Sequence, residues 1–322
     1  MKAVRVHETG GPEKLTLEDL PVPSPGSGQA LVKIHAIGVN FIDIYYRTGL
    51  YKSPLPFIPG QEAAGVVESV SGDDAGIKPG DRVAYAGTLG AYAEYALIQC
   101  SNLVKLPDDV SYESAAAVML QGMTAHYLTF STFPLRKGET VLLHAAAGGV
   151  GLLLTQIAKK IGAKVIGTVS TEEKAALARE AGTDHVILYS KQDFEQEVKK
   201  ITEGRGVDVV FDSVGRTTFE KGLNCLRRRG MMVLFGQSSG TVPALELNSL
   251  NAKGSLYVTR PGLPHYTASR DELVWRAGDV LGWVAGKSLK IRIDRVYPLT
   301  EASRAQQALE GRQTAGKVLI KP

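Results

Sequence analysis

The first third of the chain alternates short apolar and polar positions. Six runs show this alternation: residues 2–8, 14–20, 29–39, 62–70, 81–87 and 91–98. Runs with a period of two, separated by turns rich in Pro and Gly such as "PVPSPGSG", are typical of half-buried β-strands. We therefore expect a compact all-β body over residues 2 to 109.

After this body the pattern changes to apolar strands that alternate with helical periodicity. Ser111 is the expected N-cap of a helix that continues to about residue 130. Six apolar runs then follow, from "TVLLHA" at residue 140 to "GSLYVTR" at residue 254. Between them lie helical patterns such as "GLLLTQIAKKIG". This alternation predicts right-handed βαβ units and a doubly wound parallel sheet that binds a nucleotide.

The end of the chain is again rich in β-type sequence. It contains a helical pattern over residues 271–287, an apolar run over 289–299, a helical pattern near 301–311 and a strand over 317–322. We therefore expect the chain to re-enter its first domain. The predicted domains are residues 1–112 with 288–322, and residues 113–287 between them.

Composition limits the partners of the protein. The 322 residues carry a formal net charge of +4, and Lys and Arg are scattered along the sequence. A nucleic-acid partner is therefore disfavoured, whereas a mildly basic surface suits an anionic cofactor. The sequence starts without the apolar segment of a signal peptide, and no apolar run reaches the length of a membrane span. With Cys100 and Cys225 far apart, we expect buried free thiols in a cytoplasmic protein without a membrane partner.

A dinucleotide fingerprint follows the first of the apolar strands. Ala146, Gly148 and Gly151 occupy its three positions in "HAAAGGVG". Gly148 lets the backbone approach a diphosphate, Gly151 lets helix and strand pack closely, and the helix start presents free amides. Because Ala146 replaces the usual first glycine, we expect a slightly wider turn.

The end of the second strand indicates which dinucleotide fits. Sites for NADH place a carboxylate there, about twenty residues after the turn, to accept hydrogen bonds from the ribose. Here Ser170, Thr171 and Lys174 occupy this region, and hydroxyl and ammonium groups suit a 2′-phosphate. "STEE" is also a capping box, with Ser170 as the expected N-cap and Glu173 reaching back. The pattern predicts NADPH, although Glu172 and Glu173 weaken the prediction.

Seven motifs are spread along the whole chain: "GVNFIDIYYRTGLY", "IPGQEAAGVV", "GDRVAYAG", "HAAAGGVG", "FDSVG", "FGQSSG" and "GSLYVTRP". Through these motifs the chain resembles the zinc-free quinone oxidoreductases of the medium-chain dehydrogenase/reductase superfamily. The resemblance implies an α/β protein with a GroES-like β domain built from both chain ends and a Rossmann doubly wound parallel sheet between them. The active site would lie in the cleft between the domains.

The resemblance also bears on metal. Zinc alcohol dehydrogenases of the wider superfamily carry a catalytic Cys where this chain has Asn40, and a His where it has Gln61. Their lobe with four cysteines is absent, and two distant cysteines cannot form a tetrahedral sulfur site. We therefore expect no metal. Without a Lewis acid, a quinone or a related conjugated carbonyl is a more suitable acceptor of hydride than an alcohol is a donor.

The resemblance places Asn40, Tyr45 and Tyr51 beside the nicotinamide and the acceptor, as catalytic residues that offer an amide and an aromatic wall with phenolic groups. Some of these tyrosines could instead only pack the domain interface. Asp43 and Arg47 could pair only with each other. Gln61 could contact substrate or stabilise a turn.

The cofactor contacts are carried over by position. They are Asn40, Tyr45, Thr124, Gly148, Gly149, Val150, Ser170, Lys174, Tyr189, Ser213, Phe235, Gly236, Gln237, Ser238 and Arg312. Tyr189 would stack near the adenine, and Arg312 would cap the diphosphate. Gln237 departs from an Asn common among the proteins that the chain resembles. His144 lies inside a strand, which favours a structural role over a nucleophilic one.

Three functions are compatible with these residues. The first is an NADPH:quinone reductase, the second an NADPH-dependent enone or enoyl reductase, and the third an NADPH-binding structural or RNA-binding protein. The strand "GSLYVTR" is an expected sheet edge that could pair with its own copy. As the family implies the same assembly, we expect a homodimer.

Overall fold

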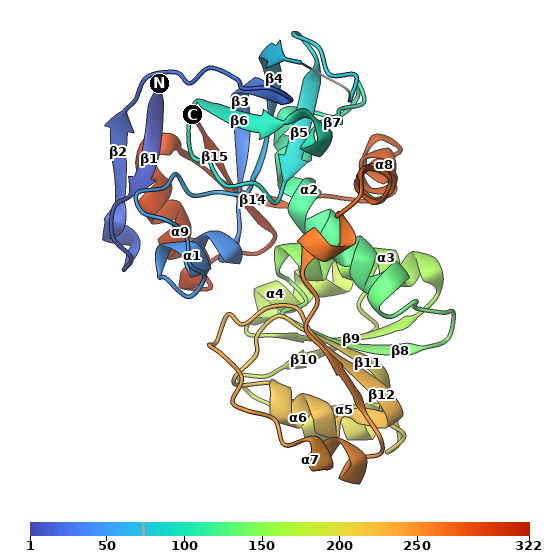
Figure 1. The fold of residues 1–322 in the computed structure, drawn as a ribbon. Helices are drawn as coiled ribbons and strands as arrows, with labels where there is room; N and C mark the ends of the chain where they lie inside the picture. Colours follow the sequence, from blue (N-terminus) through green and yellow to red (C-terminus); the bar gives the residue numbers. More distant parts are fainter. Residues whose placement is uncertain (73–74) are drawn as a thin grey trace. The chain divides into compact units, whose positions relative to one another are not determined.

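The computed structural model describes residues 1–72 and 75–322, which divide into two compact units (Figure 1). The terminal unit comprises residues 1–123 and 266–322, and the central unit comprises residues 124–265. These divisions differ from the expected change of domain after residues 112 and 287. The helix α8 (Arg270–Ala285) belongs to the terminal unit. One reason is that Arg270 donates hydrogen bonds to the carbonyls of Ser101 and Leu103.

The terminal unit is built on a sheet of the order β14-β15-β3-β4-β5-β7, with β6 paired to β3. Its strands are β3 (Gln29–Val39), β4 (Glu62–Ser71), β5 (Arg82–Ala86), β6 (Tyr95–Gln99), β7 (Val104–Lys105), β14 (Ile293–Pro298) and β15 (Lys317–Lys321). A separate antiparallel pair joins β1 (Lys2–Val6) to β2 (Leu15–Asp19). Because β15 lies between β14 and β3, the predicted re-entry of the chain is confirmed.

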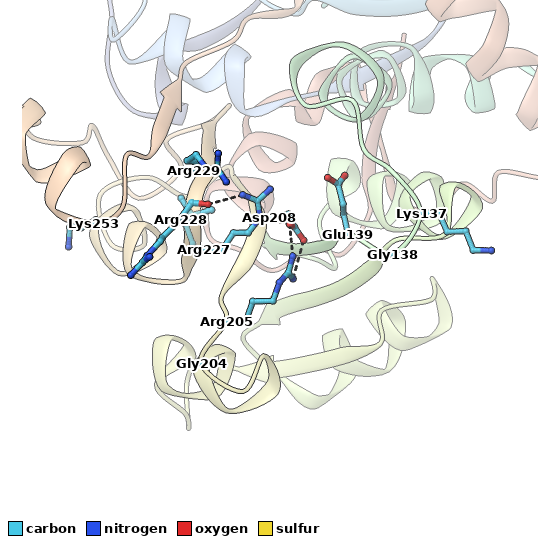
Figure 2. A pocket seen from close by; sticks show the side chains of 11 residues that line it. Lys137, Gly138, Glu139, Gly204, Arg205, Asp208, Arg227, Arg228, Arg229 and Lys253 are labelled. Atoms are coloured by element: carbon cyan, nitrogen blue, oxygen red, sulfur yellow. Dashed lines mark hydrogen bonds and ion pairs between the residues drawn. The ribbon is translucent and has the colours of Figure 1, made fainter.

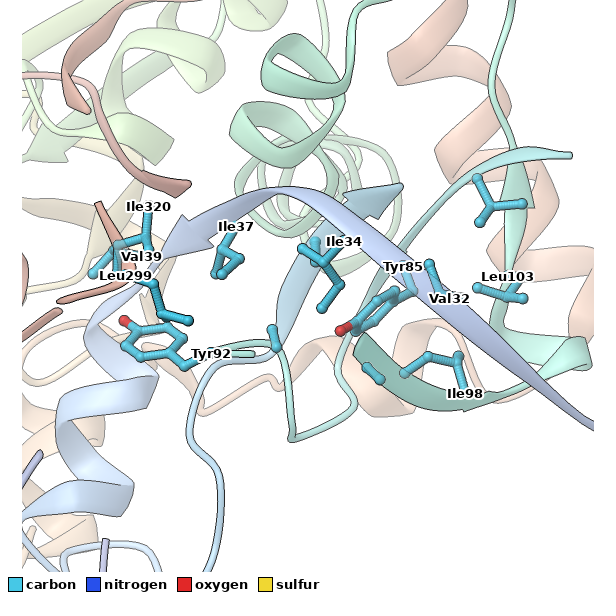
Figure 3. Packing of buried hydrophobic residues seen from close by; sticks show 14 of the residues in the cluster. Val32, Ile34, Ile37, Val39, Tyr85, Tyr92, Ile98, Leu103, Leu299 and Ile320 are labelled. Carbon is cyan, nitrogen blue, oxygen red and sulfur yellow. The ribbon is translucent and has the colours of Figure 1, made fainter. Parts of the chain in front are cut away.

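The core of the terminal unit gathers on both sides of β3. Val32, Ile34, Ile37 and Val39 are buried along this strand, where Figure 3 shows them among side chains from other strands and from near the C-terminus. These neighbours include Tyr85, Tyr92, Ile98, Leu103, Leu299 and Ile320. A strand that is buried on both faces needs apolar residues at consecutive positions, and "IGV" at the end of β3 supplies them.

Short helices complete the terminal unit. Besides α8 they are α1 (Phe41–Arg47), α2 (Tyr112–Tyr127), whose last residues lie in the central unit, and α9 (Ala302–Glu310), with 3-10 turns at Pro12–Lys14, Cys100–Asn102 and Leu299–Glu301. A further 3-10 turn, Leu263–Tyr266, spans the sequence boundary between the two units. The expected N-cap of α2 is confirmed, because the Ser111 hydroxyl accepts the Ser114 N–H at 3.1 Å. Within the described residues, none of the helices is long and apolar enough to cross a membrane.

The central unit is a parallel sheet of the order β10-β9-β8-β11-β12-β13. Its strands are β8 (Thr140–His144), β9 (Lys164–Val169), β10 (His185–Leu188), β11 (Val207–Asp212), β12 (Leu226–Leu234) and β13 (Tyr257–Thr259). In the order of the unit's own strands this is third, second, first, fourth, fifth, sixth. The predicted doubly wound nucleotide-binding sheet is therefore confirmed.

Helices cover both faces of this sheet. Figure 1 shows α3 and α4 on one face and α5, α6 and α7 on the other. Their bounds are α3 (Gly149–Ile161), α4 (Glu172–Glu180), α5 (Phe194–Ile201), α6 (Phe219–Asn224) and α7 (Leu247–Ala252), and a π-helical turn at Leu128–Thr132 continues α2. Cys100 and Cys225 are buried free thiols in their respective units, as expected. Burial raises the pKa of Cys225 to about 12.

Candidate functional site

The turn after β8 is held by backbone hydrogen bonds. Ala145 adopts a left-handed conformation with φ 55°, and the buried Ala146 donates its N–H to the carbonyl of Thr168 on β9 at 3.1 Å. The Gly148 N–H then returns to the carbonyl of Ala145 at 2.8 Å. These bonds direct the chain from β8 straight into α3.

Two glycines of this turn have little space for a side chain. A Cβ on Gly151 would lie 2.4 Å from the carbonyl oxygen of Ala145 and 2.7 Å from that of Ala146. A Cβ on Gly148 would lie 3.1 Å from the Ala145 oxygen. The close approach of α3 to the turn therefore requires glycine at position 151, as the fingerprint predicts.

The start of α3 keeps its amides available. Gly148 is the N-cap, and no side chain caps the first turn. Side chains cap the starts of other helices, among them Ser111 for α2, Thr171 for α4, Asp193 for α5 and Ser269 for α8. The N–H groups of the first turn of α3 can therefore donate to an anion, favoured by the positive end of the helix dipole.

The polar group after β9, which consists of Ser170, Thr171 and Lys174, differs in one respect from the prediction. The N-cap of α4 is Thr171, whose hydroxyl accepts the Lys174 N–H at 3.3 Å, so the expected capping by Ser170 is wrong. Ser170 instead accepts the Ser190 hydroxyl on its carbonyl at 2.8 Å. A hydrogen bond from its own N–H, followed by one from Thr171, lowers the pKa of Glu173. The side chain of Ser170 is therefore not needed for the helix start.

Other predicted cofactor residues follow neighbouring strands of the same sheet. Ser213 follows β11, and its carbonyl accepts the Ser238 N–H at 3.2 Å. A Cβ on Gly236 would lie 2.6 Å from the same carbonyl oxygen, so "FGQSSG" passes close behind β11. Tyr189 follows β10 and bonds through its N–H to Val169 at 3.1 Å. Because the strands are parallel, these residues and the turn after β8 share the carboxyl edge of the sheet.

The remaining predicted residues do not belong to the segments that follow the strands of the central sheet. Thr124 is buried on α2. Asn40, Tyr45, Tyr51 and Arg312 belong to the terminal unit. Arg312 follows α9 in a left-handed conformation with φ 57°.

A buried polar network surrounds the start of α1. Asn40 Nδ2 donates to the Gly38 carbonyl at 3.1 Å and to Glu62 Oε2 at 2.9 Å. Its Oδ1 accepts from Lys317 Nζ at 2.8 Å and from Gln121 Nε2 at 3.4 Å. The two donors and the acceptor of this amide are therefore all engaged within the terminal unit.

The centre of this network is an ion pair that the sequence analysis missed. Lys317 Nζ bonds to Glu62 Oε2, and the two side chains are 1% and 0% exposed. Glu62 Oε1 also accepts the Leu120 N–H at 2.6 Å. Breaking one partner of such a pair leaves an uncompensated buried charge, which is strongly destabilising.

Asp43 provides a second buried carboxyl beside the network. Its Oδ2 accepts the Asn40 N–H at 2.9 Å and the Tyr92 hydroxyl at 3.1 Å, whereas Oδ1 has no partner. Burial raises the pKa of Asp43 from 3.8 to about 7. The alternative in which Asp43 pairs with Arg47 is wrong, because Arg47 forms its ion pair with Glu310 at 2.8 Å.

The raised pKa of Asp43 predicts a pH-dependent stability. The folded protein favours the neutral carboxyl of Asp43. The stability that the protein has with a neutral Asp43 is therefore fully present below pH 3.8 and is lost as the pH rises toward about 7. Replacing Asp43 with Asn removes the charge and keeps an acceptor for Asn40. We expect wild type to lose about 2 kcal/mol relative to Asp43→Asn between pH 5 and pH 7. Urea unfolding of both proteins at several pH values measures this difference, and parallel profiles would contradict it.

An aromatic cluster lies beside α1. The Tyr45 and Tyr51 rings meet edge to face with centroids 5.3 Å apart, and Tyr46 meets Tyr51 at 5.7 Å. Phe41 and Phe57 extend the cluster, each at 6.4 Å from a tyrosine ring. Tyr45 is nearly buried whereas Tyr51 is partly exposed. The tyrosines therefore pack against one another, and part of Tyr51 remains exposed.

Two polar residues considered in the sequence have clear local partners. The backbone carbonyl of Gln61 accepts the Gly87 N–H at 2.8 Å. His144 is buried, its Nδ1 lies 3.0 Å from the Thr168 hydroxyl, and burial lowers its pKa. Across residues 1–72 and 75–322, no group of three or more His, Cys, Asp or Glu side chains is arranged to hold a metal ion.

Comparison with known proteins places these features in a family context. Residues 26–108 match the model of the alcohol dehydrogenase GroES-like domain, and residues 149–265 match that of the zinc-binding dehydrogenases. A quinone oxidoreductase of Pseudomonas aeruginosa is 46% identical over 323 residues, which cover 100% of this chain and 99% of the relative. A 2-haloacrylate reductase of a Burkholderia species is 42% identical, with 99% and 98% covered. The structure of Escherichia coli quinone oxidoreductase complexed with NADPH is 45% identical, with a TM-score of 0.98 and 100% of both chains covered.

Proposed function

Because the chain belongs to the zinc-free quinone oxidoreductases of the medium-chain dehydrogenase/reductase superfamily, we propose that it is an enzyme that transfers reducing equivalents from NADPH to a quinone. The observation that carries the proposal is the polar group after β9. There Ser170, Thr171 and Lys174 stand at the carboxyl edge of a dinucleotide-type sheet, without the carboxylate at the strand end that NADH sites use.

The turn after β8 suits the diphosphate of the cofactor. Gly148 allows close approach of the backbone, and the first-turn amides at Gly149 and Val150 have no side-chain cap competing for them. Ser213 and the segment from Phe235 to Ser238 lie at the same edge of the sheet and are proposed to hold the nicotinamide ribose. Tyr189, Thr124 and Arg312 are proposed as further contacts.

Lys174 is expected to discriminate between the two nicotinamide cofactors. Lys174→Ala removes an ammonium proposed to face the 2′-phosphate, so NADPH binding should weaken by about tenfold, which corresponds to 1.4 kcal/mol. NADH lacks this phosphate, and its affinity should change by less than about twofold. Fluorescence titration of both cofactors measures the two constants. Lys199→Ala, which removes an exposed lysine paired with Glu195 on α5, is the charge-matched control. Equal losses for both cofactors with Lys174→Ala would refute the assignment.

In the terminal unit, Tyr45 and Tyr51 are proposed to form the aromatic wall against the acceptor and the nicotinamide. The side-chain amide of Asn40 bonds to four residues, Gly38, Glu62, Gln121 and Lys317. We therefore propose that Asn40 holds the shape of this wall and does not itself donate a hydrogen bond to the nicotinamide or the acceptor. Bound NADPH supplies a hydride. The role of the protein residues is to position the reactants and to exclude water, since a quinone already accepts electrons readily.

The direct test is oxidation of NADPH with a panel of quinones, with and without a chelator. We expect turnover with at least one quinone and no effect of the chelator. Turnover that disappears with the chelator and returns with added zinc would overturn the metal-free proposal. The absence of NADPH oxidation with every quinone, despite tight cofactor binding, would favour the structural or RNA-binding alternative.

One relative favours a second candidate function. The Burkholderia relative is a 2-haloacrylate reductase, and an acrylate is a conjugated alkene. An NADPH-dependent enone or enoyl reductase is therefore the alternative. Comparing turnover of benzoquinone with that of an unsaturated ketone and an unsaturated acyl thioester separates the two functions.

We further propose a cytoplasmic homodimer. The strand β13 lies at the edge of the central sheet, and Tyr257 on it is 57% exposed. An exposed edge with an aromatic side chain can pair with its own copy across a two-fold axis.

A further inference from the structure

A basic hollow lies at the amino edge of the central sheet (Figure 2). Its volume is about 920 Å³, and its lining comes from the segments that precede or begin β8, β11, β12 and β13. The lining residues are Lys137, Gly138, Glu139, Gly204, Arg205, Asp208, Leu226, Arg227, Arg228, Arg229 and Lys253. The proposed cofactor turn follows β8 at the opposite, carboxyl end of the same strands. A strand of five residues separates the two ends by roughly 16 Å.

The charge of this hollow is unusual for the chain. Its lining contains six basic and two acidic residues, an excess of four. The formal net charge of the whole chain is +4, so the remaining residues carry equal numbers of basic and acidic groups. Lys and Arg looked scattered along the sequence, but the fold gathers six of them here. Clefts lined by one sign of charge concentrate ions of the opposite sign.

Arg227, Arg228 and Arg229 stand on a bulge of β12. The pairing with β11 moves from Leu226 opposite Val207 to Met231 opposite Val209, so the intervening residues of β12 leave the ladder. Arg229 within this bulge is left-handed, with φ 56°. A bulge that redirects side chains is a common feature near binding sites.

Three glycines hold the bulge in place. A Cβ on Gly206 would lie 2.7 Å from the Arg227 nitrogen, one on Gly230 would lie 2.9 Å from the Arg227 oxygen, and one on Gly254 would lie 3.1 Å from Arg228 Cγ. The backbone of the arginine run is therefore tightly packed rather than a loose surface loop.

The acidic residues neutralise only part of the hollow. The buried Asp208 bonds to Arg205 at 2.9 Å and to Arg227, and its other oxygen accepts the Thr140 N–H at 2.8 Å. Burial raises the pKa of Asp208, but the bonds from Arg227, Thr140 and Arg205 outweigh it and keep the pKa below its usual value. Figure 2 shows the bonds between Arg205 and Asp208.

Three further cations lack an acidic partner. Within the part of the chain that the structure describes, Arg228, Arg229 and Lys137 form no salt bridge. Arg228 and Arg229 are exposed next to one another. Lys253 is paired at 3.1 Å with Glu220, which lies outside the lining.

We propose that this hollow binds a small anion with several linked phosphates, of the size of tripolyphosphate or the phosphate chain of a nucleotide. Planar guanidinium groups bind phosphate oxygens in pairs, and several adjacent cations suit a chain of phosphates better than a single one. Among the described residues, no aromatic side chain lines the hollow, so these residues offer no platform for stacking a base. The phosphates, not the base, carry recognition.

The test is calorimetric titration of the full protein with sodium tripolyphosphate at low ionic strength, with NADPH present at saturation to occupy the cofactor turn. We expect one tripolyphosphate per chain. The double variant Arg228→Ala/Arg229→Gly should bind at least tenfold more weakly, and glycine suits the left-handed backbone at position 229. As a second variant that leaves the bulge intact, Lys137→Gln should bind at least threefold more weakly.

The control Lys33→Ala/Arg304→Ala removes two exposed charges from the terminal unit and should change the affinity by less than twofold. No binding at millimolar tripolyphosphate, or equal losses in the control and in the arginine variant, would overturn the proposal. ATP tested in parallel should bind no more than threefold tighter than tripolyphosphate, and tenfold tighter binding would contradict the absence of base recognition. If a single-stranded oligonucleotide displaces tripolyphosphate at a lower concentration than tripolyphosphate itself needs to bind, the ligand is a nucleic acid and the proposal of a small anion is overturned.

Discussion

Lys317→Met is expected to lower the free energy of unfolding by about 3–5 kcal/mol. The substitution keeps an unbranched side chain of similar length but removes the ammonium that pairs with Glu62. The Glu62 side chain is fully buried, so water cannot replace the lost partner without opening the core. Asn40 would also lose the hydrogen bond to its Oδ1 at 2.8 Å. Urea unfolding followed by circular dichroism measures the change.

The control lies on the same strand. Lys321 pairs with Glu113 at 2.6 Å, but its side chain is 50% exposed, and Lys321→Met should cost no more than about 1 kcal/mol. The double variant Glu62→Gln/Lys317→Met removes both charges and should be more stable than Lys317→Met alone. If Lys317→Met is no more destabilising than Lys321→Met, the ion pair does not contribute as inferred.

Gly151→Val is expected to disrupt the turn that is proposed to hold the cofactor. The Cβ would collide with the backbone oxygens of Ala145 and Ala146, at 2.4 and 2.7 Å, and these atoms cannot move without opening the turn between β8 and α3. We expect a loss of at least about 3 kcal/mol of stability, at the upper end of overpacking effects. The fraction that remains folded should bind NADPH about 100-fold more weakly, equivalent to ~2.7 kcal/mol. Urea unfolding and cofactor titration measure the two effects.

A matched substitution separates this effect from the loss of a glycine as such. Gly278 is exposed within α8, and a Cβ there would meet no atom within 4 Å. Gly278→Val should therefore change stability by less than about 1 kcal/mol. A Gly151→Val protein with wild-type stability and wild-type NADPH affinity would show that α3 can move away from the turn at little cost.

The strands and the dinucleotide turn were predictable because their signals are local. Alternation along residues 29–39 and apolar runs such as 140–145 reflect which faces are buried, and that information lies within each segment. The requirement for glycine at position 151 follows from the close packing of a helix on its own preceding strand. The structure confirms both, together with the doubly wound parallel sheet.

The buried network was not predictable because its partners are distant in sequence. Glu62 and Lys317 are 255 residues apart, and no periodic pattern links a carboxylate on one strand to an ammonium on another. Asp43 and Arg47 looked like a pair because residues four apart face each other on a helix. Arg47 instead forms an ion pair with Glu310, which is distant in sequence.

Three smaller differences from the sequence-based expectations concern the N-cap of α4, the unit to which α8 belongs and the hollow lined by arginines. Ser170 and Thr171 are both good N-cap residues, and in the structure it is the Thr171 hydroxyl that accepts the Lys174 N–H. The helix α8 has the same helical signal in either unit, and contacts with residues distant in sequence, such as those of Arg270, assign it to the terminal unit. The arginine-lined hollow was missed because charge was judged along the chain and not across the sheet edge.

The position of β15 constrains how a newly made chain can fold. This strand is synthesised after every other strand of its sheet, yet it fills the gap between β14 and β3 and brings Lys317 to Glu62. Until β15 has been made, residues 37–39 of β3 lack this partner strand and Glu62 lacks the ammonium of Lys317. The sheet of the terminal unit can therefore be completed only after every other strand of both units has been made, whereas the central sheet needs no strand beyond β13.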